Sequence, residues 1–183
     1  MMKLKNNLQK SMRAQIWVET VLYTVIGLAI IGIILAVATP VINEYKDEVV
    51  IKQTIDALNK VNQLILDVED APSGEKRSIE LAIKRGSLTI NSSGDNIIYV
   101  LEETELQYSE PGEEVKEGDI KVRTEEKGKK YNIFLALSYD NINITYNGNE
   151  EFQKFSHSAT PYTLFVENNG VINDKVSIDI RES

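Results

Sequence analysis

From Thr20 to Ile42 the chain carries no charged side chain, and most residues in this run are aliphatic. An α-helix rises about 1.5 Å per residue, so a helix over this run spans roughly 30 Å, the thickness of the hydrocarbon core of a bilayer. An ordinary secretory signal has a shorter apolar region that ends at a small-residue cleavage site, and the length of this run argues against one. The run therefore predicts a membrane-spanning helix.

The residues before this run predict its orientation. The segment from Met1 to Ala14 contains basic residues and no acidic residue: Lys3, Lys5, Lys10 and Arg13. Basic residues stay on the cytoplasmic side, so the N-terminus is expected in the cytoplasm and everything after Ile42 outside. Glu19 lies at the edge of the apolar run, where a charge is costly unless it is paired or solvated.

The basic leader, the junction Ala14-Gln15 and the acidic Glu19 before the apolar run resemble the precursor signal of type IV pilins and archaellins. The Arg13-Ala14-Gln15 form looks more archaeal than bacterial. The resemblance covers the long N-terminal helix. It implies that a prepilin peptidase in the membrane cuts between Ala14 and Gln15, and that the apolar run stays on the mature chain with Glu19 as its fifth residue.

The same resemblance implies a structural role. Members of this family are drawn by an assembly ATPase and a platform protein into a filament of identical or related subunits, with the apolar helices at the filament axis. Glu19 would then pair with the new N-terminal amine of Gln15. Two alternatives stay open: a minor pseudopilin of a secretion system, and a single-pass membrane protein whose β-domain binds a ligand without polymerising.

Beyond the membrane the helical pattern continues. Pro40 cannot donate a backbone hydrogen bond, so it should kink or loosen the helix just before it. Apolar residues then recur at three- and four-residue spacing from Val50 to Val68, which predicts an amphipathic helix lying on a sheet. This helix is expected over residues 43–70, because Pro72 cannot continue it.

After Pro72 the pattern is that of short strands. The clearest alternation of apolar and polar residues runs from Tyr131 to Tyr139, and the dipeptide Asn147-Gly148 is a strong turn signal. Late strands are expected from Tyr162 to Val166 and from Lys175 to Ile180, around a turn at residues 168–170. Residues 102–119 and 147–158 show the least regular pattern. The fold class is therefore α+β, a long N-terminal helix packed on an antiparallel β-sheet or β-sandwich head.

These features divide the 183 residues into three parts. Residues 1–14 form a cleavable leader, residues 15–42 the transmembrane and assembly helix, and residues 43–183 an extracellular head with its β-rich portion at 76–183. After cleavage the chain is expected to remain a single-pass membrane protein until it enters an extracellular filament.

Composition and motifs give little sign of catalysis. The formal charge is −8 and cysteine is absent, so neither a nucleic-acid partner nor a disulfide or cysteine-based metal site is expected. The single histidine, His157, lies in a polar segment without a nucleophile motif. Acidic residues crowd the segment 102–119 with only Lys116 to offset them, but without the spacing of a calcium loop. We expect no enzyme activity, cofactor or bound metal.

Two short motifs allow modification. Asn91-Ser92-Ser93 and Asn143-Ile144-Thr145 match the acceptor sequence for N-glycosylation, and both lie on the side of the membrane where that reaction occurs. Asn91 and Asn143 are therefore possible glycosylation sites.

Overall fold

The computed structural model describes the side chains of residues 17–183. The chain forms two compact units, residues 1–42 and residues 43–183, and each is described by itself. We call the second unit the head. Helix α1, Met2–Glu69, contributes to both units and contains Pro40 without being interrupted by it. The expected end of the helix near Asp70 is confirmed.

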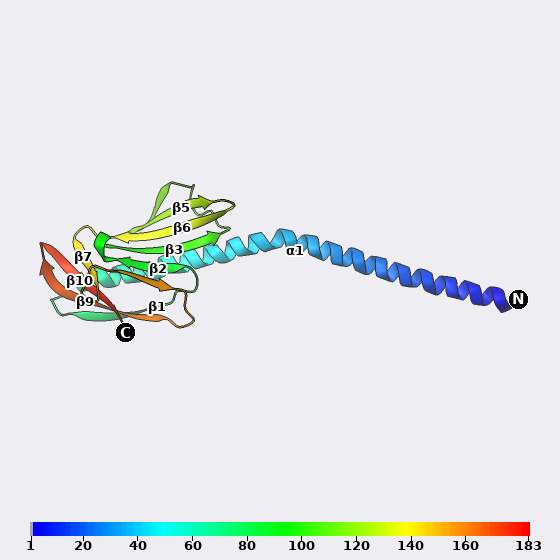
Figure 1. Cartoon of the computed structure of the whole chain (residues 1–183), viewed down its shortest axis with the longest axis horizontal. Helices are drawn as coiled ribbons and strands as arrows, with labels where there is room; N and C mark the ends of the chain where they lie inside the picture. Colours follow the sequence, from blue (N-terminus) through cyan, green and yellow to red (C-terminus); the bar gives the residue numbers. More distant parts are fainter. Residues whose placement is uncertain (1) are drawn as a thin grey trace. The chain divides into compact units, whose positions relative to one another are not determined.

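The rest of the head is built of strands (Figure 1). In chain order these are β1 (Lys76–Leu81), β2 (Ser87–Asn91), β3 (Asn96–Thr104), β4 (Glu114–Glu117), β5 (Ile120–Lys127), β6 (Lys130–Ser138), β7 (Ile142–Tyr146), β8 (Phe152–Ser156), β9 (Tyr162–Ile172) and β10 (Lys175–Glu182). A short 3₁₀ turn, η1 (Ser92–Gly94), connects β2 and β3.

The strands form two sheets. One has six strands in the order β4-β5-β6-β3-β2-β8, and the other has four in the order β1-β9-β10-β7. All pairings are antiparallel except that of β7 with β10, which is parallel. A parallel pair needs a long connection, and here β8 and β9 supply it. The predicted α+β class with mainly antiparallel sheets is confirmed.

One core holds helix and sheets together. The buried stripe of α1, which includes Ile51, Leu58 and Ile65, packs with the inner faces of both sheets in a single apolar cluster. On β6, Ile133, Leu135 and Leu137 are fully or almost fully buried while their neighbours are more exposed. The predicted stripe and the predicted alternation of β6 are therefore both confirmed.

The two segments with the least regular sequence pattern contain short strands that the pattern did not reveal. In the segment 147–158, β8 is an edge strand paired with β2. The segment 102–119 likewise contains the end of β3 and the whole of β4. Both β4 and β8 are edge strands with mostly polar, exposed residues, so the apolar alternation that reveals an interior strand is missing.

The expected turn at residues 168–170 is wrong. Strand β9 continues through these residues to Ile172, and the chain reverses at Asn173 and Asp174, which both have positive φ. Between Val176 and Ile178 of β10, the pairing on β9 moves from Val171 to Asn168, so β9 carries an extra residue there. Gly170, with φ of +85°, accommodates this bulge.

Candidate functional site

The first unit presents an apolar surface on every side. Large apolar residues from Trp17 to Ile42 are 43–71% exposed, and the most apolar window of this helix has no buried residue. Within residues 17–183, α1 is the one helix that is long and apolar enough to cross a membrane, and it lies near the N-terminus. These properties are compatible with a transmembrane helix. Water is a poor environment for such a surface, because apolar area this large is normally covered.

The hydroxyl groups of two threonines in this helix have partners within the helix itself. Thr24 Oγ1 donates to the carbonyl of Thr20 at 2.8 Å, and Thr39 Oγ1 donates to the carbonyl of Leu35 at 2.6 Å. A bonded hydroxyl can enter an apolar medium at lower cost than a free one. Both threonines are therefore compatible with lipid or with a packed helix bundle.

Small residues interrupt the bulky surface. At Gly27 and Gly32 an added Cβ would meet no atom within 4 Å. Ala36 lies four residues after Gly32, and small residues at this spacing let two helices approach closely. These positions are therefore open to a partner helix.

The polar N-terminal end contains the residues that the resemblance singled out. Glu19 lies on the exposed surface of the helix. Ala14 and Gln15 lie outside the residues whose side chains are described, so the cleavage between them stays a prediction.

In the head, the first buried residue of α1 is an aspartate. Asp47 is 1% exposed, and its carboxylate accepts a hydrogen bond from Thr104 Oγ1 and pairs with the guanidinium of Arg85. Thr104 Oγ1 in turn accepts from the backbone N–H of Leu106 at 2.9 Å. The positive φ of Glu103 and the register shift after Leu101 form the irregularity of β3 that precedes Thr104. This cluster was not predicted, because a lone Asp at the start of a stripe gives no sign of partners far along the chain.

A second buried polar group lies further along the helix. Tyr139 Oη donates to Asn62 Oδ1 at 3.0 Å, and Asn62 Nδ2 donates to Asp119 Oδ2 at 2.9 Å. Burial is the main cause that raises the pKa of Tyr139, and the negative charge of Asp119 adds to it. The phenol therefore stays neutral and keeps the orientation that donates to Asn62.

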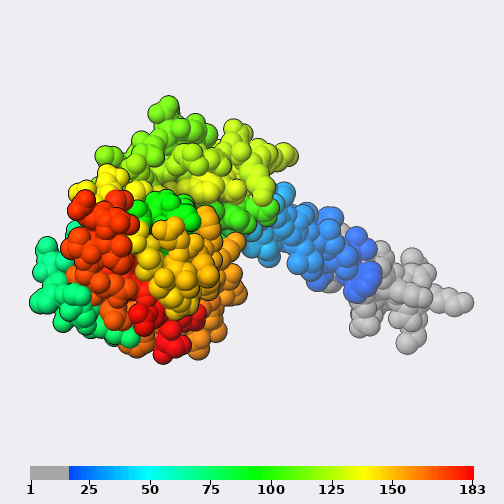
Figure 2. Space-filling view, turned by 60° about the vertical axis from the view of Figure 1, so that its left-hand side comes forward, coloured from blue at the N-terminus to red at the C-terminus, as the bar shows by residue number. Residues whose placement is uncertain are grey.

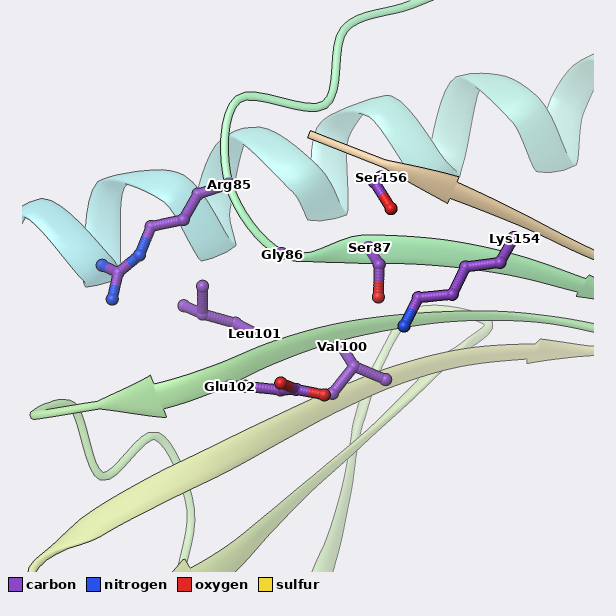
Figure 3. Close-up of a pocket in the computed structure, with 8 residues that line it drawn as sticks. All are labelled: Arg85, Gly86, Ser87, Val100, Leu101, Glu102, Lys154 and Ser156. Atoms are coloured by element: carbon purple, nitrogen blue, oxygen red, sulfur yellow. The ribbon is translucent and has the colours of Figure 1, made fainter. Parts of the chain in front are cut away.

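A hollow of about 280 Å³ opens where β2, β3 and β8 meet (Figure 3). Ser87, Ser156 and Lys154 line it, whereas the Arg85 side chain points away from Lys154. Gly86 lets the chain pass close to β3, since an added Cβ would lie 2.4 Å from the carbonyl oxygen of Val100. Because Arg85 pairs with Asp47 and the remaining charged lining residues are exposed, the hollow presents no preorganised catalytic group.

The acidic segment is better compensated than its sequence indicates. Lysines that lie later in the chain approach it: Lys127 is 3.5 Å from Glu103, Lys130 is 3.9 Å from Glu105, and Lys121 is 3.8 Å from Glu114. Within residues 17–183 no three metal-binding side chains come together.

The other candidate residues lie apart from one another. His157 is exposed after the end of β8. Asn91 accepts a hydrogen bond from the backbone N–H of Gly94 at 3.2 Å, and its sequon partner Ser93 is exposed. Asn143 lies in β7, and its sequon partner Thr145 is buried and donates to Asp179 at 2.7 Å. In the folded head, only the Asn91 sequon has an exposed hydroxyl.

The chain matches no protein-family model, no curated protein and no solved structure. The fold and surface define its class as an α+β protein in which one helix supplies both an exposed apolar segment and part of the core of a β-rich head.

Proposed function

We propose that this chain is the structural subunit of a type IV pilus-like surface filament. The observation that carries the proposal concerns the two parts of α1. One part is apolar and has no buried residue in its most apolar window, and the next is amphipathic with its apolar stripe buried. A helix of this kind can be stored in a bilayer and then transferred to a helix bundle at small net cost, because both environments are apolar. The head needs no partner to cover its own stripe.

The sequence supports the processing that such a subunit requires. The basic leader and the Ala14-Gln15 junction would direct a prepilin peptidase to release a mature chain beginning at Gln15. Glu19 would then lie four residues from the new amine, near the membrane interface. In the filament, pairing of Glu19 with the amine of Gln15 would offset the cost of enclosing a carboxylate among apolar helices.

The decisive test is the N-terminus of the protein extracted from membranes. Mass spectrometry should find a chain that starts at Gln15, and Ala14→Lys should abolish cleavage while Ser11→Ala, a control outside the junction, should not. A mature chain that begins at Met1, or near Thr39 after cleavage by a signal peptidase, would contradict the proposal. Shearing the cells that make this chain should release extracellular filaments composed of the processed chain.

A further inference from the structure

A hollow on the head has an apolar lining and a basic rim. It lies between α1 and the start of the β-rich region, has a volume of about 260 Å³, and is lined by Val50, Ala57, Ile79 and Ala82 among others. The charged residues in its lining are Lys60, Lys84 and Glu80. Lys84 donates to Gln53 at 3.4 Å, and within residues 17–183 neither lysine is paired with a carboxylate. The hollow therefore carries a net positive charge around apolar side chains.

An exposed segment of the same head has the opposite character. Glu150 and Glu151 precede Phe152, the first residue of β8, and all three residues are exposed. Phe152 is 68% exposed, which is unusual for a phenylalanine in a folded domain. Neither glutamate pairs with a cation in the described part of the chain. The Glu150–Phe152 segment is therefore an exposed aromatic side chain preceded by two carboxylates without a cation partner among residues 17–183.

The hollow and the Glu150–Phe152 segment are complementary in charge and in apolar character. The two glutamates match Lys60 and Lys84, and Phe152 matches the apolar side chains of the lining. Within one head they do not meet, because Phe152 remains exposed. Two copies of the chain can realise the match, because each copy carries both surfaces.

We propose that Glu150-Glu151-Phe152 of one copy docks into the Lys60–Lys84 hollow of a second copy. This inference rests on the proposed function and names one contact between neighbouring heads in the filament. The two surfaces are different patches, so the contact is heterologous and can repeat from copy to copy. A filament requires contacts of this heterologous kind.

The contact is small, and it need not hold two free molecules together. Bundled or membrane-held apolar helices keep the heads at a high effective concentration, at which a single anchored aromatic side chain contributes substantially. The helices would supply most of the assembly energy, and the head contact would fix the rotation from one subunit to the next.

Substitutions in the full-length chain test the contact in cells that lack the wild-type protein. Phe152→Ala should lower the yield of sheared filaments about tenfold, the effect of losing an interface anchor. Val171→Ala is the matched control, since Val171 is 70% exposed on another part of the head, and it should leave the yield unchanged. Glu151→Lys and Lys84→Glu should each lower the yield, and the double variant should recover most of it.

Cross-linking provides a readout that does not depend on filaments. The natural chain has no cysteine, so a disulfide-linked dimer can form only through introduced residues. Cells that co-express Ala82→Cys and Glu150→Cys chains should yield a dimer after mild oxidation, whereas either chain alone should not. Ala82→Cys paired with Val171→Cys should also give none.

The outcomes separate the two proposals. Normal filaments from Phe152→Ala together with no dimer from the mixed chains would overturn the contact and leave the filament proposal standing. A dimer without wild-type filaments would support the contact and contradict the filament. A dimer through Val171→Cys instead would identify a different occupant of the hollow and overturn the contact as stated.

Discussion

The side-chain amide of Asn168 donates a hydrogen bond to the backbone carbonyl of Val68 at 2.9 Å. The same nitrogen also lies 3.2 Å from the carbonyl oxygen of Glu69 and 3.0 Å from that of Ala71. The last carbonyls of a helix have no partner within the helix, and a glycine in the left-handed conformation usually helps to satisfy them. Here a residue of β9 does so, which joins the end of α1 to the four-stranded sheet.

This relationship predicts a stability effect at Asn168. Asn168→Ala would remove this donor from all three carbonyls and leave that of Val68 with only the backbone N–H of Ala71 at 3.3 Å. The free energy of unfolding of the head should therefore fall by about 2 kcal/mol. Asn169→Ala is the control, because Asn169 is exposed at the next position, and it should change stability by less than about 0.5 kcal/mol. Thermal unfolding followed by circular dichroism measures both. Equal melting temperatures for the two variants would show that the cap contributes nothing.

Asn168 also shows why its segment was misjudged from sequence. Asn-Asn-Gly is a strong local turn signal, and nothing nearby in the chain reveals that the amide is needed at the end of a helix about 100 residues earlier. Gly170 still takes the positive φ that the signal predicts, but as a bulge. Figure 2 shows the orange-red β9–β10 hairpin beside the turquoise segment that follows α1, and an added Cβ on Gly170 would lie 3.2 Å from Ser73 Oγ.

The parts of the fold that were predicted correctly are those specified by local periodicity. The stripe around Ile51, Leu58 and Ile65 and the alternation of β6 each repeat over many residues, so the burial they predict does not depend on distant partners. Asp47, just before this stripe, and Asn62, within it, are buried polar residues. Their partners Arg85 and Asp119 lie far along the chain, and a single sequence cannot reveal such pairs.

Asp47 should be more important for stability than an ordinary ion-paired residue. Asp47→Ala would remove the acceptor of the buried Thr104 hydroxyl and the counter-ion of Arg85, and unfolding should become easier by about 2 kcal/mol. Arg85 is 44% exposed and can turn towards water, which limits the loss. Glu48→Ala removes the exposed Glu48–Lys52 pair and serves as the control, with an expected loss below about 0.5 kcal/mol. Urea titration of both variants measures the difference, and similar midpoints would refute it.

The raised pKa of Tyr139 predicts that the folded head loses stability in alkaline solution. Because burial raises the pKa of its phenol in the folded head, the unfolded chain loses this proton first, at its ordinary pKa of about 10. The contribution of Tyr139 is thus fully present below about pH 10 and declines as the pH rises above it. Tyr139→Phe should be less stable than the wild type at pH 8, because Asn62 loses a donor, and should lose less stability between pH 9 and pH 11. Tyr45→Phe, at an exposed position, is the control and should lose stability with pH as the wild type does. If Tyr139→Phe also follows the wild-type profile, the Tyr139 phenol does not cause the alkaline loss of stability.

The head should fold without the apolar segment. A chain that lacks residues 1–40 keeps the buried stripe and all the strands, so it should be monomeric and unfold cooperatively. In this chain Leu58→Asp would place a carboxylate at a position with no exposure, and the head should fail to fold. Gln63→Asp, at an exposed position of the same helix, should leave the melting temperature nearly unchanged. A folded Leu58→Asp head would mean that the stripe is not part of the core.

Glu19 separates a filament subunit from a simple membrane anchor. Near the membrane interface its carboxylate can stay hydrated in a single subunit, but inside a helix bundle it needs a cation, which the amine of Gln15 would provide. Glu19→Val should therefore leave membrane insertion, cleavage after Ala14 and head folding unchanged. The yield of extracellular filaments should fall at least about tenfold, because an unpaired amine would remain among apolar helices. Glu19→Asp, which shortens the reach to the amine, should give an intermediate yield. The measurement is the ratio of sheared filaments to membrane-retained subunit in cells that make only the variant. Normal filaments from Glu19→Val would remove the proposed role of this carboxylate, whereas a processed wild-type chain that never leaves the membrane would favour the single-pass anchor.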